Sequence, residues 1–547
     1  MNRNVEARFS EIPNVEVERS IFDRSCTHKT SFNVGDLIPF YVDEVLPGDS
    51  FRVTTSKVVR LQTMLTPIMD NIYLDTYFFF VPNRLIWSHW KEFMGENTSS
   101  AWVQQTTYQV PTISSPTSTG FATGTIADYM GLPVGVTWSA TDALAPSALP
   151  FRAYAKVCDD WFRSEVLTDP LNIPTGDTNQ VGTNGGSYIN DVANGGLPFK
   201  VAKYFDLFSS SLPSPQKAIN PVTFPLISGS KAPVFTSATD LVSGAHTAMS
   251  LAKADGSTTP AGDFALAMNN HKLFKTTASG ATTDGGLYPA NLYADLSSSV
   301  GAVSINELRL AFQLQKFYER CSRGGTRYIE LIRSHFGITS PDARLQRSEY
   351  LGGNRIPLNV HEVTNSAQST NDFLGDLGAK SATSDVHDDF EKSFTEHGFV
   401  IGVCCARYDH SYSQGMEKFW TRKQTMDYYF PVFANIGEVP VNQSEICATS
   451  ANIATPVTWG YQEAWYDYRY KPDRVSGEMR PGIANTLASW HLSDYYATAP
   501  TLSDAWLRED KTNVDQLLSD LRLHADEQYL TYALEKPFDF LHSLYLQ

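Results

Sequence analysis

The chain has 547 residues, a formal net charge of −16 and only 19% charged residues. An acidic chain is poorly suited to neutralise nucleic acid by itself, because phosphate binding requires concentrated Lys and Arg. Its longest apolar runs, residues 77–82 and 399–406, are too short to cross a bilayer, so we expect no membrane insertion.

The first 217 residues predict an arm followed by a β-rich core. Residues 1–35 are mixed polar and predict an extended N-terminal arm that packs on a neighbour. Residues 36–217 are expected to form the first part of the core, with long loops. Within residues 36–63, β-branched runs flank Pro47-Gly48, which predicts two strands joined by a type II turn.

An aromatic cluster follows these two strands. Residues 77–81 predict a strand that is buried on both faces and ends at Pro82. Residues 85–94 predict a short helix stopped at Gly95, and a further helix is expected near residues 156–166. The aromatic cluster either lines a ligand cleft or belongs to a core or subunit interface. The second interpretation is favoured, because large apolar side chains are mostly buried.

Residues 218–300 differ in composition from the rest of the chain. They are dominated by Ser, Thr, Ala and Gly, with few charges and weak periodicity. This composition is compatible with a disordered linker. An unstructured stretch of this length is unusual inside a compact protein, however, so we expect a small appended β-rich lobe.

The remaining part, residues 301–547, begins with the strongest helical pattern of the chain. A capping box, S-I-N-E, stands at residues 304–307, and apolar residues then recur at three- and four-residue steps up to Phe317. We therefore expect a helix with one buried face. It should stop at residues 324–325, both Gly, and be followed by a shorter helix that ends at Gly337.

Strands and loops are expected in the rest of the chain. Residues 356–363 predict a strand by alternation, residues 364–391 a long polar loop, and residues 399–409 a buried strand. Residues 504–547 mix short helical pieces with aromatic residues and predict a C-terminal docking tail.

The central region also carries a distinctive series of motifs. Residues 323–353 contain, in order, R-G-G-T-R-Y, R-S-H-F-G, S-P-D-A-R-L-Q-R and Y-L-G-G. This run resembles the central signature of gokushovirus major capsid proteins. Gokushoviruses belong to the Microviridae, small tailless bacteriophages with circular single-stranded DNA. The resemblance extends to five further stretches: residues 33–51, 93–96, 204–217, 460–480 and 489–492.

The resemblance implies a mainly β fold: the eight-stranded antiparallel jelly roll of viral capsids, with large loop insertions and a helical insert. It implies a major capsid protein that self-assembles into a T=1 icosahedral shell of about 60 copies around a circular single-stranded DNA genome. Localisation would be the virion, assembled in the bacterial host cytoplasm.

The resemblance also implies partners. In gokushoviruses the insertion that corresponds to residues 218–300 forms a surface protrusion at the threefold axes, where we expect attachment to a host surface receptor. Because the shell protein is acidic, a small basic DNA-binding virion protein is expected to help neutralise the genome.

Basic residues are concentrated in two places, and six of them are candidate contacts to nucleic acid. These are Arg320, Arg323, Arg327, Arg469, Lys471 and Arg474. In the second group the cations alternate with tyrosines, which suits stacking on single-stranded bases. The alternative, ion pairs between subunits, is favoured, because Arg is preferred in such pairs and the chain has a net negative charge.

The sequence shows no catalytic constellation: it contains no G-x-S-x-G elbow, P-loop, H-E-x-x-H or dinucleotide fingerprint. We therefore expect no enzyme activity, no cofactor and no metal. Residues 385–391 offer acidic ligands but lack EF-hand spacing, so a solvated acidic loop is favoured. The six cysteines include no C-x-x-C pair, which fits free thiols in a reducing compartment. Adjacent Cys404 and Cys405 are expected to be buried on opposite faces of one strand.

A second hypothesis belongs to a different class of protein. Acidity and many aromatic residues are also compatible with a carbohydrate-binding or carbohydrate-active β-sandwich protein. That hypothesis predicts a monomer with a discrete cleft and a carboxylate pair. The capsid hypothesis predicts shells or pentamers instead.

Overall fold

The computed structural model of the chain describes the following residues: 20–61, 64, 66–97, 106–117, 119–217, 234–236, 251–253, 265–269, 272–276, 287–289, 292–294, 305–324, 328–338, 346–366, 374, 375, 377–434, 436–510, 513 and 538–546. Predictions for residues 1–19, 304, 327 and 339–345 lie outside this described part. The chain divides into two units, residues 1–215 with 324–547, and residues 216–323.

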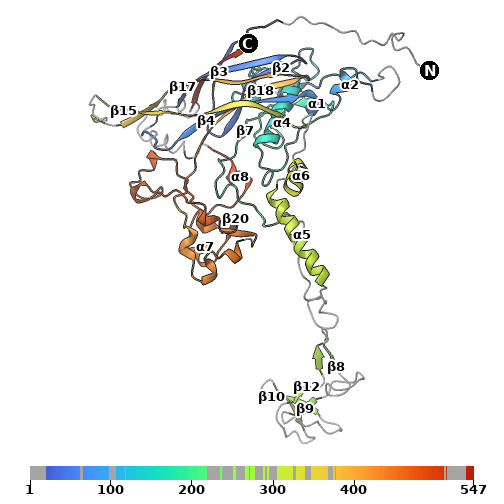
Figure 1. Ribbon diagram of the computed structural model, residues 1–547, viewed down its shortest axis with the longest axis vertical. Coiled ribbons are helices and arrows are strands. Elements are labelled where there is room, and N and C mark those ends of the chain that lie inside the picture. The colour runs from blue at the N-terminus through green and yellow to red at the C-terminus, as the bar shows by residue number, and fades with distance from the viewer. Residues whose placement is uncertain are drawn as a thin grey trace, which may run out of the picture. The chain divides into compact units, whose positions relative to one another are not determined.

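The larger unit contains two large antiparallel sheets in its described part. The five-stranded sheet has the order β14 (Glu349–Pro357), β4 (Ile72–Pro82), β18 (Gly398–Tyr408), β2 (Asp36–Val45), β7 (Phe199–Lys200). The four-stranded sheet has the order β1 (Cys26–Ser31), β21 (Phe538–Leu546), β3 (Ser50–Leu61), β17 (Thr383–Ser393). Strands from both halves of the chain are thus interleaved, as the blue and orange ribbons show in Figure 1. The fold is mainly β with antiparallel sheets.

The turn between β2 and β3 is the one that the sequence predicts. Gly48 has a φ of +92°, which glycine adopts without strain, and it follows Pro47, whose ring fixes φ at a negative value. The backbone amide of Asp49 donates to the carbonyl oxygen of Leu46 at 3.1 Å and closes the turn. The prediction of two strands joined at Pro47-Gly48 is confirmed.

Strand β4 is buried on both faces, also as predicted. Phe78 and Phe80 point into the core between the two sheets, whereas Phe79 and Val81 belong to a second core on the other side of the five-stranded sheet. Strand β18 repeats this arrangement next to β4. Its Cys404 lies in the first core and Cys405 in the second, so the expected opposite orientation of the two thiols is confirmed.

The second core is built with short helices. They are α1 (Asn83–Ile86), α2 (Trp90–Phe93), α3 (Ile126–Tyr129) and α4 (Leu149–Val157), which continues into the π-helical turn η2 (Cys158–Phe162). Helix α4 is fixed to the sheet by Tyr154, whose hydroxyl donates to the carbonyl oxygen of Leu37 at 2.5 Å. The remaining short elements of this region are β5 (Ile113–Ser114), β6 (Gln180–Val181) and η3 (Val192–Asn194).

Two helix predictions in this region were wrong in their limits. The single helix expected at residues 85–94 is two short helices, α1 and α2, although Gly95 ends the second one with a φ of +100°. The helix expected near residues 156–166 begins earlier, at Leu149. Pro150 explains this earlier start. Proline is favoured in the first turn of a helix, because the backbone amide that it lacks has no acceptor within that turn.

The prediction of a polar loop at residues 364–391 was wrong. Half of this stretch forms β16 (Leu377–Ser381) and β17, and β16 pairs with β15 (Val360–Thr364). The strand expected at residues 356–363 is likewise divided between β14 and β15.

The polar side chains of β17 are satisfied by distant strands, which the local sequence does not reveal. Asp389 accepts from the Thr55 hydroxyl at 2.6 Å, and Asp385 lies 3.8 Å from the buried Lys57 ammonium. The acidic stretch is therefore a strand with internal contacts, and the expectation of a solvated loop is corrected.

A third cluster of apolar side chains holds together residues 204–212 and 409–509, which we call the lobe. Its buried members are Phe208, Tyr412, Val441, Ile446, Cys447, Trp459 and Tyr466. The strands and α-helices of the lobe are β19 (Glu438–Asn442), β20 (Thr458–Glu463), α7 (Ser450–Ala454) and α8 (Asp504–Leu507). Its 3-10 turns are η4 (Lys418–Thr421), η5 (Thr425–Asp427), η6 (Pro431–Phe433), η7 (Gln443–Glu445), η8 (Tyr466–Tyr468), η9 (Gly477–Met479) and η10 (Ala488–Trp490).

The smaller unit, residues 216–323, spans the whole of the expected insertion together with helix α5 (Ile305–Arg323). Its described strands are β8 (Val234–Thr236), β9 (Leu251–Lys253), β10 (Ala265–Asn269), β11 (Lys272–Thr276), β12 (Leu287–Pro289) and β13 (Leu292–Ala294). They form a sheet of order β10-β11-β12-β9 and a separate β13-β8 pair.

The two predicted central helices are present. Helix α5 ends at Arg323, directly before Gly324, and α6 (Tyr328–Phe336), in the larger unit, ends at Gly337 with a φ of +70°. The expected buried face of α5 was wrong for the single chain, since Leu308, Phe312 and Phe317 are all exposed. Helical period identified the apolar stripe but not what covers it.

Candidate functional site

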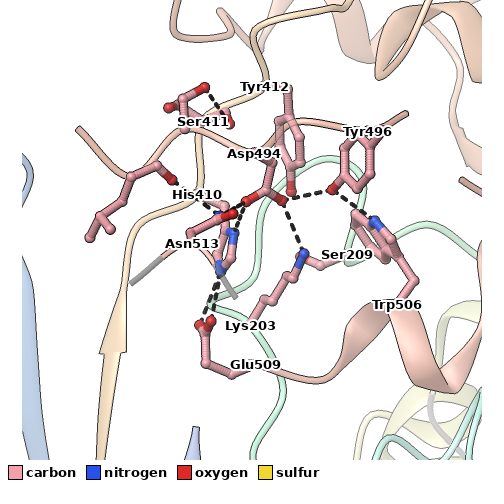
Figure 2. Close-up of polar contacts among 12 residues, drawn as sticks. Lys203, Ser209, His410, Ser411, Tyr412, Asp494, Tyr496, Trp506, Glu509 and Asn513 are labelled. Carbon is pink, nitrogen blue, oxygen red and sulfur yellow. Dashed lines mark hydrogen bonds and ion pairs between the residues drawn. The ribbon is translucent and has the colours of Figure 1, made fainter. Parts of the chain in front are cut away.

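The most elaborate polar arrangement in the described part of the chain surrounds His410, which follows β18 (Figure 2). The imidazole lies between two carboxylates: its Nδ1 is 2.9 Å from Asp494 Oδ1, and its Nε2 is 3.0 Å from Glu509 Oε2. All three side chains are at most 5% exposed. Three segments of the chain thus meet at one buried histidine.

Asp494 is the most heavily bonded member of this group (Figure 2). Lys203 Nζ donates to its Oδ2 at 3.1 Å, and the hydroxyl of Tyr496 donates to the same oxygen at 2.7 Å. Trp506 in turn donates from Nε1 to the Tyr496 hydroxyl, and Asn513 donates from Nδ2 to Asp494 Oδ1. We call His410, Asp494, Glu509 and Lys203 the ionic cluster.

The charged forms of His410 and Asp494 stabilise each other, because the two groups lie close together. Burial by itself lowers the pKa of His410, but the facing carboxylates of Asp494 and Glu509 outweigh this effect and raise it to about 9. Burial would raise the pKa of Asp494, but His410 and Lys203 hold it well below its usual range. At neutral pH the cluster therefore contains an imidazolium beside the ionised carboxylate of Asp494.

This arrangement is suited to holding segments together. Both imidazole nitrogens are engaged by carboxylates, and a protonated imidazole has no lone pair with which to accept a proton. The cluster joins the end of β18 to three other segments, around Lys203, Asp494 and Glu509. A buried charge is costly to leave without a partner. The ionic cluster therefore acts as an electrostatic clamp that holds the lobe to the end of β18.

A second buried carboxylate, that of Asp75, lies on β4. Asp75 is only 1% exposed and accepts from Arg355 Nε of β14 at 2.7 Å and from Arg407 Nη2 of β18 at 2.5 Å. Tyr204 donates to Asp75 at 2.9 Å, and both guanidinium groups lie 4.3 Å from the centre of its ring. Burial would raise the pKa of Asp75, but the two arginines lower it. This group ties three strands to the start of the lobe.

The structure places three of the six predicted nucleic-acid contacts on the lobe, each beside a carboxylate. Arg469 lies 2.7 Å from Glu463, while Lys471 and Arg474 both bond to Glu417, Lys471 at 2.5 Å and Arg474 Nε at 2.7 Å. The side chains of the three cations are exposed. Among these three, Lys471 and Arg474 are brought together by a shared partner, Glu417.

The other three predicted contacts belong to the central helices. Arg320 and Arg323 lie in the last turn of α5 and are exposed. Arg327 lies outside the described residues. Since α5 belongs to the smaller unit, the six cations are not brought into one site by the described contacts, and their role in binding DNA stays a prediction.

A group of large apolar side chains lies on the surface of the lobe. Seven large apolar side chains in η4, η5, η6 and their connections are each at least 40% exposed. We call them the aromatic surface: Phe419, Trp420, Met426, Tyr428, Tyr429, Phe430 and Val432. The signal in the sequence was Pro431, which interrupts the aromatic run and prevents a continuous strand.

Neither a metal site nor a membrane-spanning helix is found in the described part of the chain. Among the residues that the structure describes, no group of three or more His, Cys, Asp or Glu side chains is arranged to hold a metal ion. The described helices include none with the length and apolar character that a membrane span requires.

Comparison with known proteins identifies the family. Residues 10–541 match the profile of the family described as capsid protein (F protein). Capsid protein VP1 of Spiroplasma virus 4 is 38% identical over 525 residues, which are 93% of this chain and 92% of that protein. The VP1 capsid proteins of Bdellovibrio phage phiMH2K and Chlamydia phage 1 are each 36% identical, over 94% of this chain and 92% of their own lengths.

The matches extend over the sheets, the ionic cluster and the lobe alike, because they cover nearly the whole chain. They confirm the resemblance to gokushovirus-type capsid proteins of the Microviridae. The chain belongs to the phage capsid protein (F protein) family.

Proposed function

We propose that the chain is the major capsid protein of a small tailless phage and that about 60 copies close into a T=1 icosahedral shell around circular single-stranded DNA. The observation that carries this proposal is similarity to three capsid proteins over more than nine tenths of both lengths. Localisation follows from it: the chain is part of the virion and assembles in the bacterial cytoplasm.

The sheets support a jelly-roll sandwich as the shell-forming fold. Strands β2, β4, β14 and β18 belong to the five-stranded sheet, whereas β3 and β17, which lie between them in the chain, belong to the four-stranded one. The chain therefore crosses repeatedly between two packed sheets, which is typical of Greek-key and jelly-roll connections. Strands β1 and β21 extend the four-stranded sheet beyond β3.

The shell needs rigid subunits, and the two buried charge groups supply rigidity at the base of the lobe. The Asp75 group joins β4, β14 and β18 to Tyr204, and the ionic cluster joins the end of β18 to Lys203. Lys203 and Tyr204, which are consecutive in the chain, are thus held by two separate buried networks. Such networks favour one orientation of the lobe, because other orientations leave buried charges without partners.

Six basic residues are the proposed contacts to the genome. The candidates remain Arg320, Arg323, Arg327, Arg469, Lys471 and Arg474, with a small basic virion protein supplying further positive charge. Because carboxylates lie beside the last three, we expect each of these three to contribute only modestly to DNA retention. Genome retention measured against salt, after each group of three is changed to Gln, tests the contribution of each group.

The insertion at residues 218–300 is proposed as the surface protrusion that contacts a host receptor. Its support is that it falls in a unit separate from the sheets, so variation there leaves the sandwich intact. Deleting the insertion should leave assembly possible while abolishing adsorption to host cells. Loss of both properties would assign the insertion to assembly instead.

Electron microscopy of the purified chain with its virion partners tests the main proposal. We expect closed shells of uniform diameter that protect circular single-stranded DNA from nuclease. A monodisperse monomer under these conditions would overturn the proposal.

The carbohydrate-active alternative is not favoured. It requires a pair of carboxylates free to act as acid and base, whereas Asp494 and Glu509 are both engaged by His410.

A further inference from the structure

The seven members of the aromatic surface together expose a large apolar area. Phe, Tyr and Trp side chains each offer about 150–250 Å² when fully exposed, so the half-exposed members of this surface present on the order of 600 Å². That matches or exceeds the largest apolar patch of a typical monomer, about 300–600 Å², and approaches the roughly 800 Å² per partner of a stable interface.

The backbone beneath these side chains is fixed within the chain. The carboxylate of Asp427 accepts from the backbone amides of Lys423 and Gln424, both at 2.8 Å, and closes η5. Trp465 Nε1 donates to the carbonyl oxygen of Phe433 at 2.8 Å and anchors the end of η6. The exposure of the aromatic surface is therefore not that of a loose loop.

Trp465 itself adopts a left-handed backbone conformation, with a φ of +67°. For a bulky residue this conformation costs about 1 kcal/mol or more. The strained residue lies under the aromatic surface, with its ring 5.5 Å from that of Tyr429. A preorganised surface pays less ordering entropy when a partner binds, because its side-chain platform is already in place.

Charge indicates what kind of partner fits. Beside the aromatic surface, Arg422 pairs with Asp467, and Lys471 and Arg474 pair with Glu417. The Arg422 guanidinium also lies 4.3 Å from the ring centre of Tyr468. The three cations face two carboxylates, so the surface offers phosphate groups a surplus of only one positive charge from these pairs. An apolar surface with internally paired arginines instead matches the composition of a protein interface.

We propose that the aromatic surface docks on a second copy of this chain in the capsid shell. The inference rests on the proposed function, since a shell built from one major chain must cover exposed apolar surface with other copies of that chain. It deepens that function by naming the face of the lobe through which neighbouring copies meet. The cations at its edge lie beside carboxylates of the same chain, which leaves the contact mainly apolar.

A double variant tests the proposal. Trp420→Ser with Val432→Ser removes two of the most exposed members, and Leu144→Ser, at a side chain that is 95% exposed outside the lobe, is the matched control. We expect sedimentation to show a shell yield at least about tenfold lower for the double variant, and a yield within about twofold of wild type for the control. The thermal midpoint of the unassembled double variant should stay within about 2 °C of wild type.

A second experiment keeps the test decisive if the double variant folds poorly. Tyr428 is replaced by the photoreactive residue p-benzoylphenylalanine, and assembled particles are irradiated. Covalent links between two copies of the chain are the expected product. Links to DNA alone, or no links between chains, would overturn the proposal, as would a double variant that assembles normally or that loses only host adsorption. Failure of the wild-type chain to assemble would instead count against the proposed function.

Discussion

Two aromatic stretches of nearly the same composition have opposite fates in this chain. Residues 77–81 read Y-F-F-F-V and form the centre of β4, where Phe78 is fully buried. Residues 428–432 read Y-Y-F-P-V and lie on the surface of the lobe, where Val432 is 88% exposed. Both stretches are apolar enough to favour burial. The backbone conformation of each stretch determines whether other parts of the same chain can cover it.

The backbone difference has an identifiable cause. In β4, residues 73–80 pair with β18 on one side and β14 on the other, and the alternating side chains enter two cores. Pro431 lacks the amide that a central strand requires, and η5 and η6 turn the chain on either side of it. The stretch therefore cannot join a sheet, and its side chains remain outward.

The ion pairs of the two regions differ in the same way. Asp75 on β4 is buried and pairs with the mostly buried Arg407 and the half-exposed Arg355, whereas the cations bonded to Glu417 on the lobe are exposed. Buried pairs are costly to break because the remaining charge has no water, while exposed pairs contribute little.

Removing one ring from each aromatic stretch should give the largest difference. Phe78 packs edge-on against Phe40 at 5.5 Å and lies 5.4 Å from Phe390, so Phe78→Ala leaves a cavity in the core between the sheets. We expect the free energy of unfolding to fall by about 3–5 kcal/mol. The matched variant Phe430→Ala should change it by less than about 1 kcal/mol. Urea unfolding of the unassembled chains measures both, and equal losses would refute the comparison.

Removing one carboxylate charge from each ionic group should give a somewhat smaller difference. Asp75→Asn leaves Arg407 buried without a counter-charge, and we expect a loss of about 3 kcal/mol in the free energy of unfolding. Glu417→Gln, its exposed counterpart, should cost no more than about 1 kcal/mol. The same unfolding measurement decides; a large loss for Glu417→Gln would mean that the lobe surface is part of the folding core.

Features with local causes were predictable from the sequence. The turn at Pro47-Gly48, the doubly buried β4, the opposite orientation of Cys404 and Cys405, and the ends of α5 and α6 all follow from residue order within a few positions. The family signature was equally local, since it lies within one continuous run.

Features that depend on distant partners were not predictable. Strand β17 looked like a polar loop because its acids are satisfied by Thr55 and Lys57 on β3, more than 300 residues earlier. The cation at Lys471 looked available because its partner, Glu417, lies 54 residues away. The ionic cluster was missed for the same reason, although a histidine directly after a buried strand was a usable signal.

The smallest expected effect concerns pH and compares a buried histidine with an exposed one. The pKa of His410 is raised to about 9, so its stabilising contribution is complete below its ordinary value of 6.5 and is lost as the pH rises through 9. We expect the folded chain to lose about 2 kcal/mol of unfolding free energy between pH 7 and pH 9 on this account.

The difference between wild type and His410→Gln isolates this loss, because all other groups titrate in both chains. In His410→Gln the fall from pH 7 to pH 9 should be smaller by that amount. His89→Gln, which removes an exposed histidine beside Asp177, should retain the full fall. Identical pH profiles for wild type and His410→Gln would mean that the clamp on the lobe does not depend on the imidazolium. The comparison between buried and exposed charge would then hold for Asp75 but not for the ionic cluster.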